Sequence, residues 1–293
     1  MDVIKDAVNS ASHTIEGLYD AVYAILFGGL SGERVPFSNF LCYCGISPES
    51  RMSKEEYEKI KRVIGDVDTN RYLYWYDMEL KIESLADRVC AVQSLYVDFD
   101  IKLPRIDSIE EKDIQSARID ISSRSDDIYI AANNIFVAIA ASLDILAKVA
   151  YEISHIDEYD FSEYKQMKSK AVLFKPNLSV DMEFKKNGMV FSSMPCLRLI
   201  EEFRKEYVHN SSWSYRASVY EARDTTGNLL PRFMLFPDYD ERGCFIKSGA
   251  RGHFYSQGNK INEKMPDIIV PSIKAIDNTV KSMIRFCYNK VKV

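Results

Sequence analysis

The chain has 293 residues, of which 46% are apolar and 28% are charged, and its formal net charge is −5. This composition is typical of a folded soluble protein of one or two domains and excludes a disordered or low-complexity chain. The absence of a basic excess excludes a broadly cationic nucleic-acid-binding protein. Any contact with nucleic acid must therefore be a local patch.

The six cysteines are scattered, and only Cys42 and Cys44 lie close together. Their C-x-C spacing is not the usual one for zinc or redox sites, and scattered cysteines are typical of a reducing compartment. The N-terminus has no basic segment leading into an apolar run, and the longest apolar run, Ile135 to Leu143, is far shorter than a membrane span. We therefore expect a cytoplasmic protein without membrane association.

Hydrophobic periodicity predicts an N-terminal helical region over residues 1–104. A first helix is expected at about 2–27, and Gly28 closes it. Ser53 and Glu56 form a capping box for a short helix that runs to about Ile64. A second long helix is expected at about 70–99.

Residues 105–293 form the second predicted region. Ser108 with Glu111 offers another capping box, and helix-compatible sequence follows to Ser154. Because this is unusually long for a globular helix, we expect a break near 122–126. The second half, about 128–153, is the most apolar helix in the chain and should be central.

A lysine-rich connector follows between His155 and Met194. We expect one short helix near 161–170 and a strand around 188–191 within it.

The next predicted helix begins with Pro195, which suits a first turn because its missing N–H would have no partner there. It carries an apolar face of four residues at helical spacing: Cys196, Ile200, Phe203 and Tyr207. On an ideal helix Arg204 lies about 70° from the centre of that face, and His209 about 150° from it. The run that begins at Asn210 ends the helix.

Short apolar runs separated by Gly, Asp, Asn and Pro then predict a small antiparallel β insertion at about 215–258. A final helix at about 267–290 closes the chain. The predicted fold class is therefore mainly α. The sequence contains no Gly-rich phosphate loop, no paired-histidine metal spacing and no G-x-S-x-G motif, so we expect no cofactor or metal.

Two side chains at the tip of the 196–209 helix have chemistry beyond packing. Imidazole in general titrates near neutral pH, so His209 can act as a general acid or base, while Arg204 can hold a phosphate through its planar guanidinium. Each also has a structural alternative. His209 can be a surface histidine favoured by the helix dipole, and Arg204 can pair with Glu201 one turn earlier.

The spacing of Arg204 and His209 at a helix end, followed by Asn210, resembles the R-x4-6-H motif of the HEPN superfamily. The resemblance covers roughly residues 126–291. It extends to the order of the elements, which are a long apolar helix, a polar connector, the motif helix and a closing helix.

This resemblance implies an antiparallel HEPN-like helical bundle, with the N-terminal helices as an extension. It implies a metal-independent endoribonuclease that acts as a toxin or antiviral-defence effector. It also implies RNA as the substrate, a homodimer whose paired motifs form one cleft, and an antitoxin or another defence-system protein as a partner. Arg204 and His209 would then be the catalytic residues.

Other residues of the motif region are candidates for supporting roles. Lys205 departs from the family, whose active members often have a polar Asn, Asp or His after the arginine, and it can add affinity for phosphate. Glu201 and Asp144 could orient the Arg204 guanidinium. A lone acid in an apolar helix is costly unless it is paired, so Asp144 should have a partner. Tyr207 and Asn210 complete the supporting set.

The segment from Lys247 to Lys260 mixes cations, glycines and aromatic rings, as single-stranded RNA binding requires. We expect RNA contacts from four of its residues: Lys247, Arg251, His253 and Tyr255. The alternative is a solvated hairpin end. For the whole protein, two further hypotheses stay open: a non-catalytic HEPN-like module that binds RNA, a nucleotide or a partner protein, and a purely structural helical scaffold.

Overall fold

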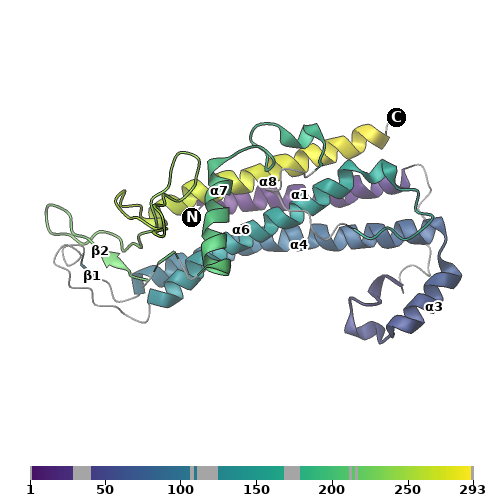
Figure 1. The fold of residues 1–293 in the computed structure, drawn as a ribbon, viewed down its shortest axis with the longest axis horizontal. Coiled ribbons are helices and arrows are strands. Elements are labelled where there is room, and N and C mark those ends of the chain that lie inside the picture. Colours follow the sequence, from purple (N-terminus) through teal and green to yellow (C-terminus); the bar gives the residue numbers. More distant parts are fainter. Residues whose placement is uncertain are drawn as a thin grey trace. The chain divides into compact units, whose positions relative to one another are not determined.

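The computed structural model describes residues 2–28, 41–105, 109–110, 125–167, 179–210, 213–214 and 217–291. The described chain is mainly helical (Figure 1), as the sequence predicts. Six of the predicted helices are present as α1 (Asp2–Phe27), α3 (Lys54–Ile64), α4 (Val67–Lys102), α6 (Ser125–Ser154), α7 (Pro195–His209) and α8 (Ile261–Val291). Short 3-10 helices occur at η1 (Pro48–Ser50), η2 (Leu103–Arg105), η3 (Ile156–Glu158) and η4 (Met182–Lys185).

Local signals account for where several helices begin. The Ser53 side chain and Glu56 form the predicted capping box at the start of α3. Pro195 occupies the first turn of α7, and the Asn210 N–H ends that helix by donating to the Lys205 carbonyl at 3.3 Å. The capping residues predicted at Ser108 and Glu111 lie outside the described residues. The helix predicted to start there is wrong at residues 109–110, which form strand β1 (Ile109–Glu110) because they pair with a strand far along the chain.

The last helix begins at Ile261, earlier than the predicted start at about 267. Pro266 and Pro271 lie inside it. A proline removes one backbone donor but does not stop burial, and the apolar side chains on either side of Pro266, those of Met265 and Ile268, are buried. Burial of this face outweighs the loss of the backbone hydrogen bonds.

Two predictions in the connector are wrong. Residues 161–167 are not helical, because Asp160 accepts hydrogen bonds from the backbone N–H and hydroxyl of Ser162 at 3.0 Å and forms a turn instead. The end of that predicted helix, 168–170, lies outside the described residues. The segment 188–191 is a turn and not a strand, since Gly188 has φ +80° and Ser192 N–H bonds back to the Met189 carbonyl.

The chain divides into two compact units. Unit 1 comprises Met1–Ser12, Asp87–Leu143 and Asn187–Asp277, and unit 2 comprises His13–Ala86, Asp144–Lys186 and Asn278–Val293. The predicted division into regions 1–104 and 105–293 stays a prediction.

The core of unit 1 contains stacked aromatic rings from α6 and α7. Phe136 and Phe203 stack with ring centroids 4.1 Å apart and planes 5° from parallel. Trp213, which follows α7, meets Phe203 edge-to-face at 5.6 Å. Its indole N–H donates to the Asn133 side-chain oxygen at 2.7 Å, and all four residues are buried. This hydrogen bond ties the chain after α7 to α6.

The predicted β insertion is present as a turn-rich segment rather than as a sheet. Over residues 217–260, antiparallel pairing consists of isolated bridges such as Tyr220 with Phe233. Strand β2 (Tyr220–Glu221) pairs in parallel with β1 (Ile109–Glu110). Aspartate side chains hold the turns: buried Asp238 accepts hydrogen bonds from the backbone N–H groups of Ser256 and Gln257.

One turn of this segment lies directly on the start of α7. Gly243 has φ +81°, and a Cβ at this position would come within 2.0 Å of the Pro195 carbonyl oxygen. Only glycine allows this approach. The insertion therefore packs on the motif helix.

Unit 2 has a buried polar centre. The Glu152 carboxylate is buried and accepts hydrogen bonds from the hydroxyls of Tyr74 at 2.8 Å and Tyr159 at 3.0 Å. Burial, followed by the Glu152 charge, raises the pKa of both tyrosines. They stay protonated and able to donate.

Among the described helices, only the α6 stretch Asp126–Ser154 is long and apolar enough to cross a membrane. In its most apolar window, 67% of the residues are buried inside the protein. This burial is typical of a core helix, as expected for the most apolar helix of the chain.

Replacing Trp213 with Phe should lower the free energy of unfolding by about 1–3 kcal/mol, because the buried Asn133 oxygen loses its donor. Urea unfolding measures this change. In an Asn133→Leu background the same substitution should cost less, since the acceptor is already gone. Equal costs in the two backgrounds would mean that packing alone explains the role of Trp213.

Candidate functional site

The tip of α7 places the motif residues in different surroundings. His209 is the last helical residue and is exposed, and Lys205 one turn earlier is also exposed. Arg204 is half-buried, and its guanidinium lies 3.4 Å from the Glu201 carboxylate. This pairing is the structural alternative that the sequence analysis gives for Arg204, and an orienting role of Glu201 at a catalytic site stays a prediction.

Arg204 and His209 do not share a face of the helix. Five residues of ideal helix separate two side chains by about 140° around the axis and about 7.5 Å along it. A phosphate that touches both groups therefore requires the helix end to relax or a second chain to supply one of them.

The remaining supporting residues have separate environments. Tyr207 is half-buried and meets Tyr129 edge-to-face, with ring centroids 6.0 Å apart. Asp144 on α6 is half-buried and has an interaction partner, as expected of a lone acid in an apolar helix. It belongs to unit 2, whereas α7 belongs to unit 1, so its role beside Arg204 stays a prediction.

A charged cluster that the sequence analysis missed surrounds Glu206 on the neighbouring face of α7. The Glu206 side chain is only 9% exposed, and Lys247 lies 3.1 Å from it and 3.0 Å from Glu202. The Asn210 side chain donates to Glu206 at 2.9 Å, and His253 Nε2 lies 3.7 Å away. We call these five residues the Glu206 cluster.

Hydrogen bonds within the cluster favour the ionised forms of Glu206 and Lys247. Burial raises the pKa of Glu206, but hydrogen bonds from Asn210 and Lys247 outweigh it, so the net shift is downward. Burial lowers the pKa of Lys247, yet hydrogen bonds to Glu202 and Glu206 raise it above its ordinary value. The pair is therefore fully ionised at neutral pH. No local sequence pattern predicts this pair, because Lys247 lies about 40 residues after Glu206.

For His253 the effect of burial on the pKa is larger than that of the neighbouring charges. Burial lowers its pKa and outweighs the attraction of Glu206. Its Nε2 is buried and makes no hydrogen bond within the described chain. At neutral pH the imidazole is therefore neutral, packed edge-to-face against Phe245 with ring centroids 5.8 Å apart.

The predicted RNA-binding residues therefore lie in different places. Lys247 and His253 come together at Glu206. The Tyr255 hydroxyl donates to the Trp213 carbonyl, and burial raises the pKa of this tyrosine. Arg251 is exposed, with its backbone paired to Ser248 in a hairpin turn. Of the four, Arg251 is the cation that extends into solvent, and the RNA contacts stay a prediction.

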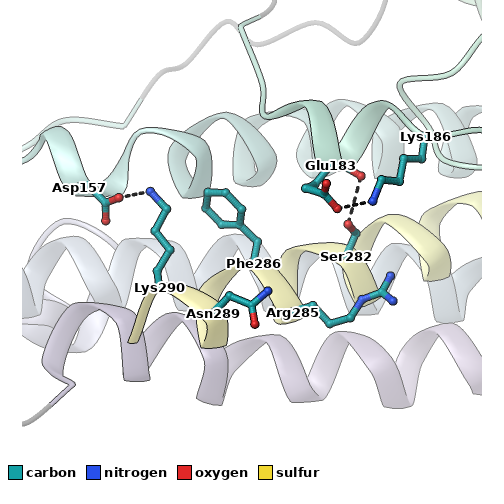
Figure 2. Close-up of a pocket in the computed structure, with 8 residues that line it drawn as sticks. All are labelled: Asp157, Glu183, Lys186, Ser282, Arg285, Phe286, Asn289 and Lys290. Carbon is teal, nitrogen blue, oxygen red and sulfur yellow. Dashed lines mark hydrogen bonds and ion pairs between the residues drawn. The ribbon is translucent and has the colours of Figure 1, made fainter. Parts of the chain in front are cut away.

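A separate cavity of about 740 Å³ lies in unit 2, along α8 (Figure 2). Two ion pairs flank its aromatic residue Phe286: Lys290 with Asp157, and Lys186 with Glu183. Arg285 adds an exposed cation. Because most of its charges are paired within the protein, this cavity has no strong preference for the charge of a ligand, and it contains none of the predicted site residues.

Among the residues that the structure describes, no three His, Cys, Asp or Glu side chains are grouped to hold a metal ion. Comparison of the chain with protein-family models, with curated proteins and with solved structures gives no match. Its function must therefore be argued from its own residues.

Acidification from pH 7.5 to 5.5 should lower the free energy of unfolding through His253. Because its folded pKa lies below the ordinary value of about 6.5, the unfolded chain takes up a proton that the folded chain resists. The stability is complete above about pH 6.5 and is lost as the pH falls below it. Urea unfolding at several pH values measures the slope.

His253→Gln should flatten this slope. His13→Gln is the matched control, since His13 is exposed on α1 outside the cluster. A slope that survives in the His253 variant would assign the pH dependence to other groups. Below about pH 4.5, loss of the Glu206 charge should destabilise the wild type further, because its pKa is lowered in the folded state.

Proposed function

We propose that this protein is a HEPN-type, metal-independent endoribonuclease that acts in the cytoplasm as a toxin or antiviral-defence effector. The observation that carries the proposal is the exposed imidazole of His209 at the C-terminal end of α7. A histidine in that position is accessible and can exchange protons with a substrate.

The order of the elements supports the same proposal. A long apolar helix α6, a polar connector, the motif helix α7 and the closing helix α8 follow one another as in the family that the motif resembles. We infer a HEPN-like antiparallel bundle over residues 126–291, with α1, α3 and α4 as the N-terminal extension.

In the proposed reaction the RNA 2′-oxygen attacks the adjacent phosphorus, and the bond from phosphorus to the 5′-oxygen of the next nucleotide breaks. The 2′-hydroxyl loses its proton and the departing 5′-oxygen gains one, and His209 assists this proton transfer. Arg204 stabilises the charge that develops on the phosphate oxygens. Lys205 is exposed one turn before His209 and adds attraction for the phosphate. The products are a 2′,3′-cyclic phosphate and a 5′-hydroxyl.

A homodimer is part of the proposal, because the two catalytic groups point about 140° apart on one helix. Two copies of α7 related by a twofold axis would place Arg204 of one protomer and His209 of the other at one phosphate.

A second candidate function is a non-catalytic HEPN-like module that binds RNA, a nucleotide or a partner protein. The contact of Arg204 with Glu201 favours it, because this carboxylate neutralises part of the charge that a phosphate would need. The use of Asn210 by Glu206 favours it as well.

Purified protein should cleave single-stranded RNA in the presence of EDTA, and His209→Ala should reduce the rate by about 100-fold or more, as expected for loss of a general acid or base. His13→Ala is the matched control. Urea unfolding should show that both variants are folded. RNA binding without cleavage would establish the non-catalytic module, and cleavage that survives His209→Ala would place the activity elsewhere.

Mixing Arg204→Ala protein with His209→Ala protein should restore part of the activity if each site uses one residue from each protomer. In the mixed dimer one of the two sites then has both residues intact. No recovery after subunit exchange, with each variant inactive alone, would contradict a shared site. Light scattering on the same samples measures whether the protein is dimeric.

A further inference from the structure

One face of α4 combines aromatic rings with carboxylates. Tyr72, Trp75 and Tyr76 are followed on this face by Glu79 and Glu83. These positions are three or four residues apart along the helix, so the side chains form a single stripe. A stripe that only packs in a core would continue with apolar residues, and this one continues with acids.

Two tyrosines from other parts of unit 2 complete a cavity over this stripe. Tyr19 comes from α1, and Tyr43 comes from the segment after residue 40. The rings of Tyr43 and Tyr76 meet edge-to-face at 6.0 Å, and those of Tyr72 and Trp75 lie 5.5 Å apart. The cavity has a volume of about 420 Å³, which is in the range of small-molecule sites.

The cavity has a buried base and an open mouth. Trp75 is only 7% exposed, and further aromatic rings at Tyr23 and Phe27 hold it edge-on. Tyr43 is 53% exposed at the mouth. Glu83 is exposed, and Glu79 is half-buried. A ligand would therefore enter past carboxylates and end against rigid rings.

The charge of the lining is of one sign. Among the residues that the structure describes, those that line it are five aromatic residues, two glutamates and Leu80, with no lysine or arginine. Burial raises the pKa of Tyr76, and the charges of Glu79 and Glu83 add to the effect. Both carboxylates therefore line the same cavity as this ring.

We propose that this cavity binds a small organic cation through an alkylated ammonium group. The faces of Trp and Tyr rings attract a cation that has lost part of its water shell, and alkyl groups on the nitrogen reduce the cost of losing it. The two carboxylates add attraction and exclude anions. A neutral apolar ligand would gain nothing from Glu79 and Glu83.

The test uses choline and spermidine with the full-length protein, each titrated by calorimetry and by tryptophan fluorescence. Trp75 is one of only two tryptophans, and the Trp213→Phe variant isolates its signal. Both cations contain the proposed group. Tighter binding of choline assigns the site to quaternary ammonium compounds, and tighter binding of spermidine assigns it to polyamines.

The neutral control ligand is 3,3-dimethylbutan-1-ol, which has the shape of choline without its charge. We expect it to bind at least about tenfold more weakly, because the cation–π and charge attractions are missing. Equal binding of the neutral and charged compounds would overturn the proposal, as would the absence of binding by both cations at millimolar concentrations.

Glu83→Gln should weaken choline about threefold, and Tyr43→Leu about fivefold, since each removes one attraction at the open mouth. Glu55→Gln is the matched control: it removes the same charge from α3, outside the cavity. Unchanged affinity in both mouth variants would contradict this site. Binding should also be unaffected by His209→Ala, so that this proposal and the nuclease proposal fail independently.

Discussion

The hydrogen bond from the Trp213 indole to Asn133 is the constraint on which the arrangement of unit 1 depends. It joins the chain leaving α7 to α6 inside a cluster of aromatic rings that includes the stacked pair Phe136 and Phe203. The Tyr255 hydroxyl holds the same tryptophan through its backbone carbonyl. The end of α7, where the candidate catalytic groups lie, is therefore held from two sides.

The turn-rich segment 217–260 determines which faces of α7 remain accessible. Gly243 packs on Pro195 at the start of the helix, and Lys247 and His253 cover Glu206 nearer its end. Two residues that the sequence predicts to contact RNA thus pack on an acid of the same unit: Lys247 pairs with the charge of Glu206, and His253 helps to bury it. His209 and Lys205 stay exposed beside this contact. The exposed end of α7 therefore lies beside an acidic face that the insertion occupies.

In unit 2, as in unit 1, a buried carboxylate accepts hydrogen bonds from side chains of the same unit. Glu152 is buried and accepts hydrogen bonds from Tyr74 and Tyr159, and burial in turn raises the pKa of those hydroxyls. Glu79 and Glu83 beside Trp75 line a cavity instead. Glu83 is exposed there, whereas Glu152 lies inside the unit.

Periodicity and caps are local signals, so the sequence alone predicts most of the helices: α1, α3, α4, α6 and α7 begin and end within a few residues of their predicted limits. It also contains the Arg204–His209 spacing and the aspartates that form turns. The start of α8, by contrast, depends on tertiary packing, because the burial of side chains around Pro266 outweighs the loss of a backbone hydrogen-bond donor. The contacts of Glu206 with Lys247 and His253 also depend on tertiary packing. They join residues more than about 40 positions apart, so they follow from how the insertion packs and not from any local pattern.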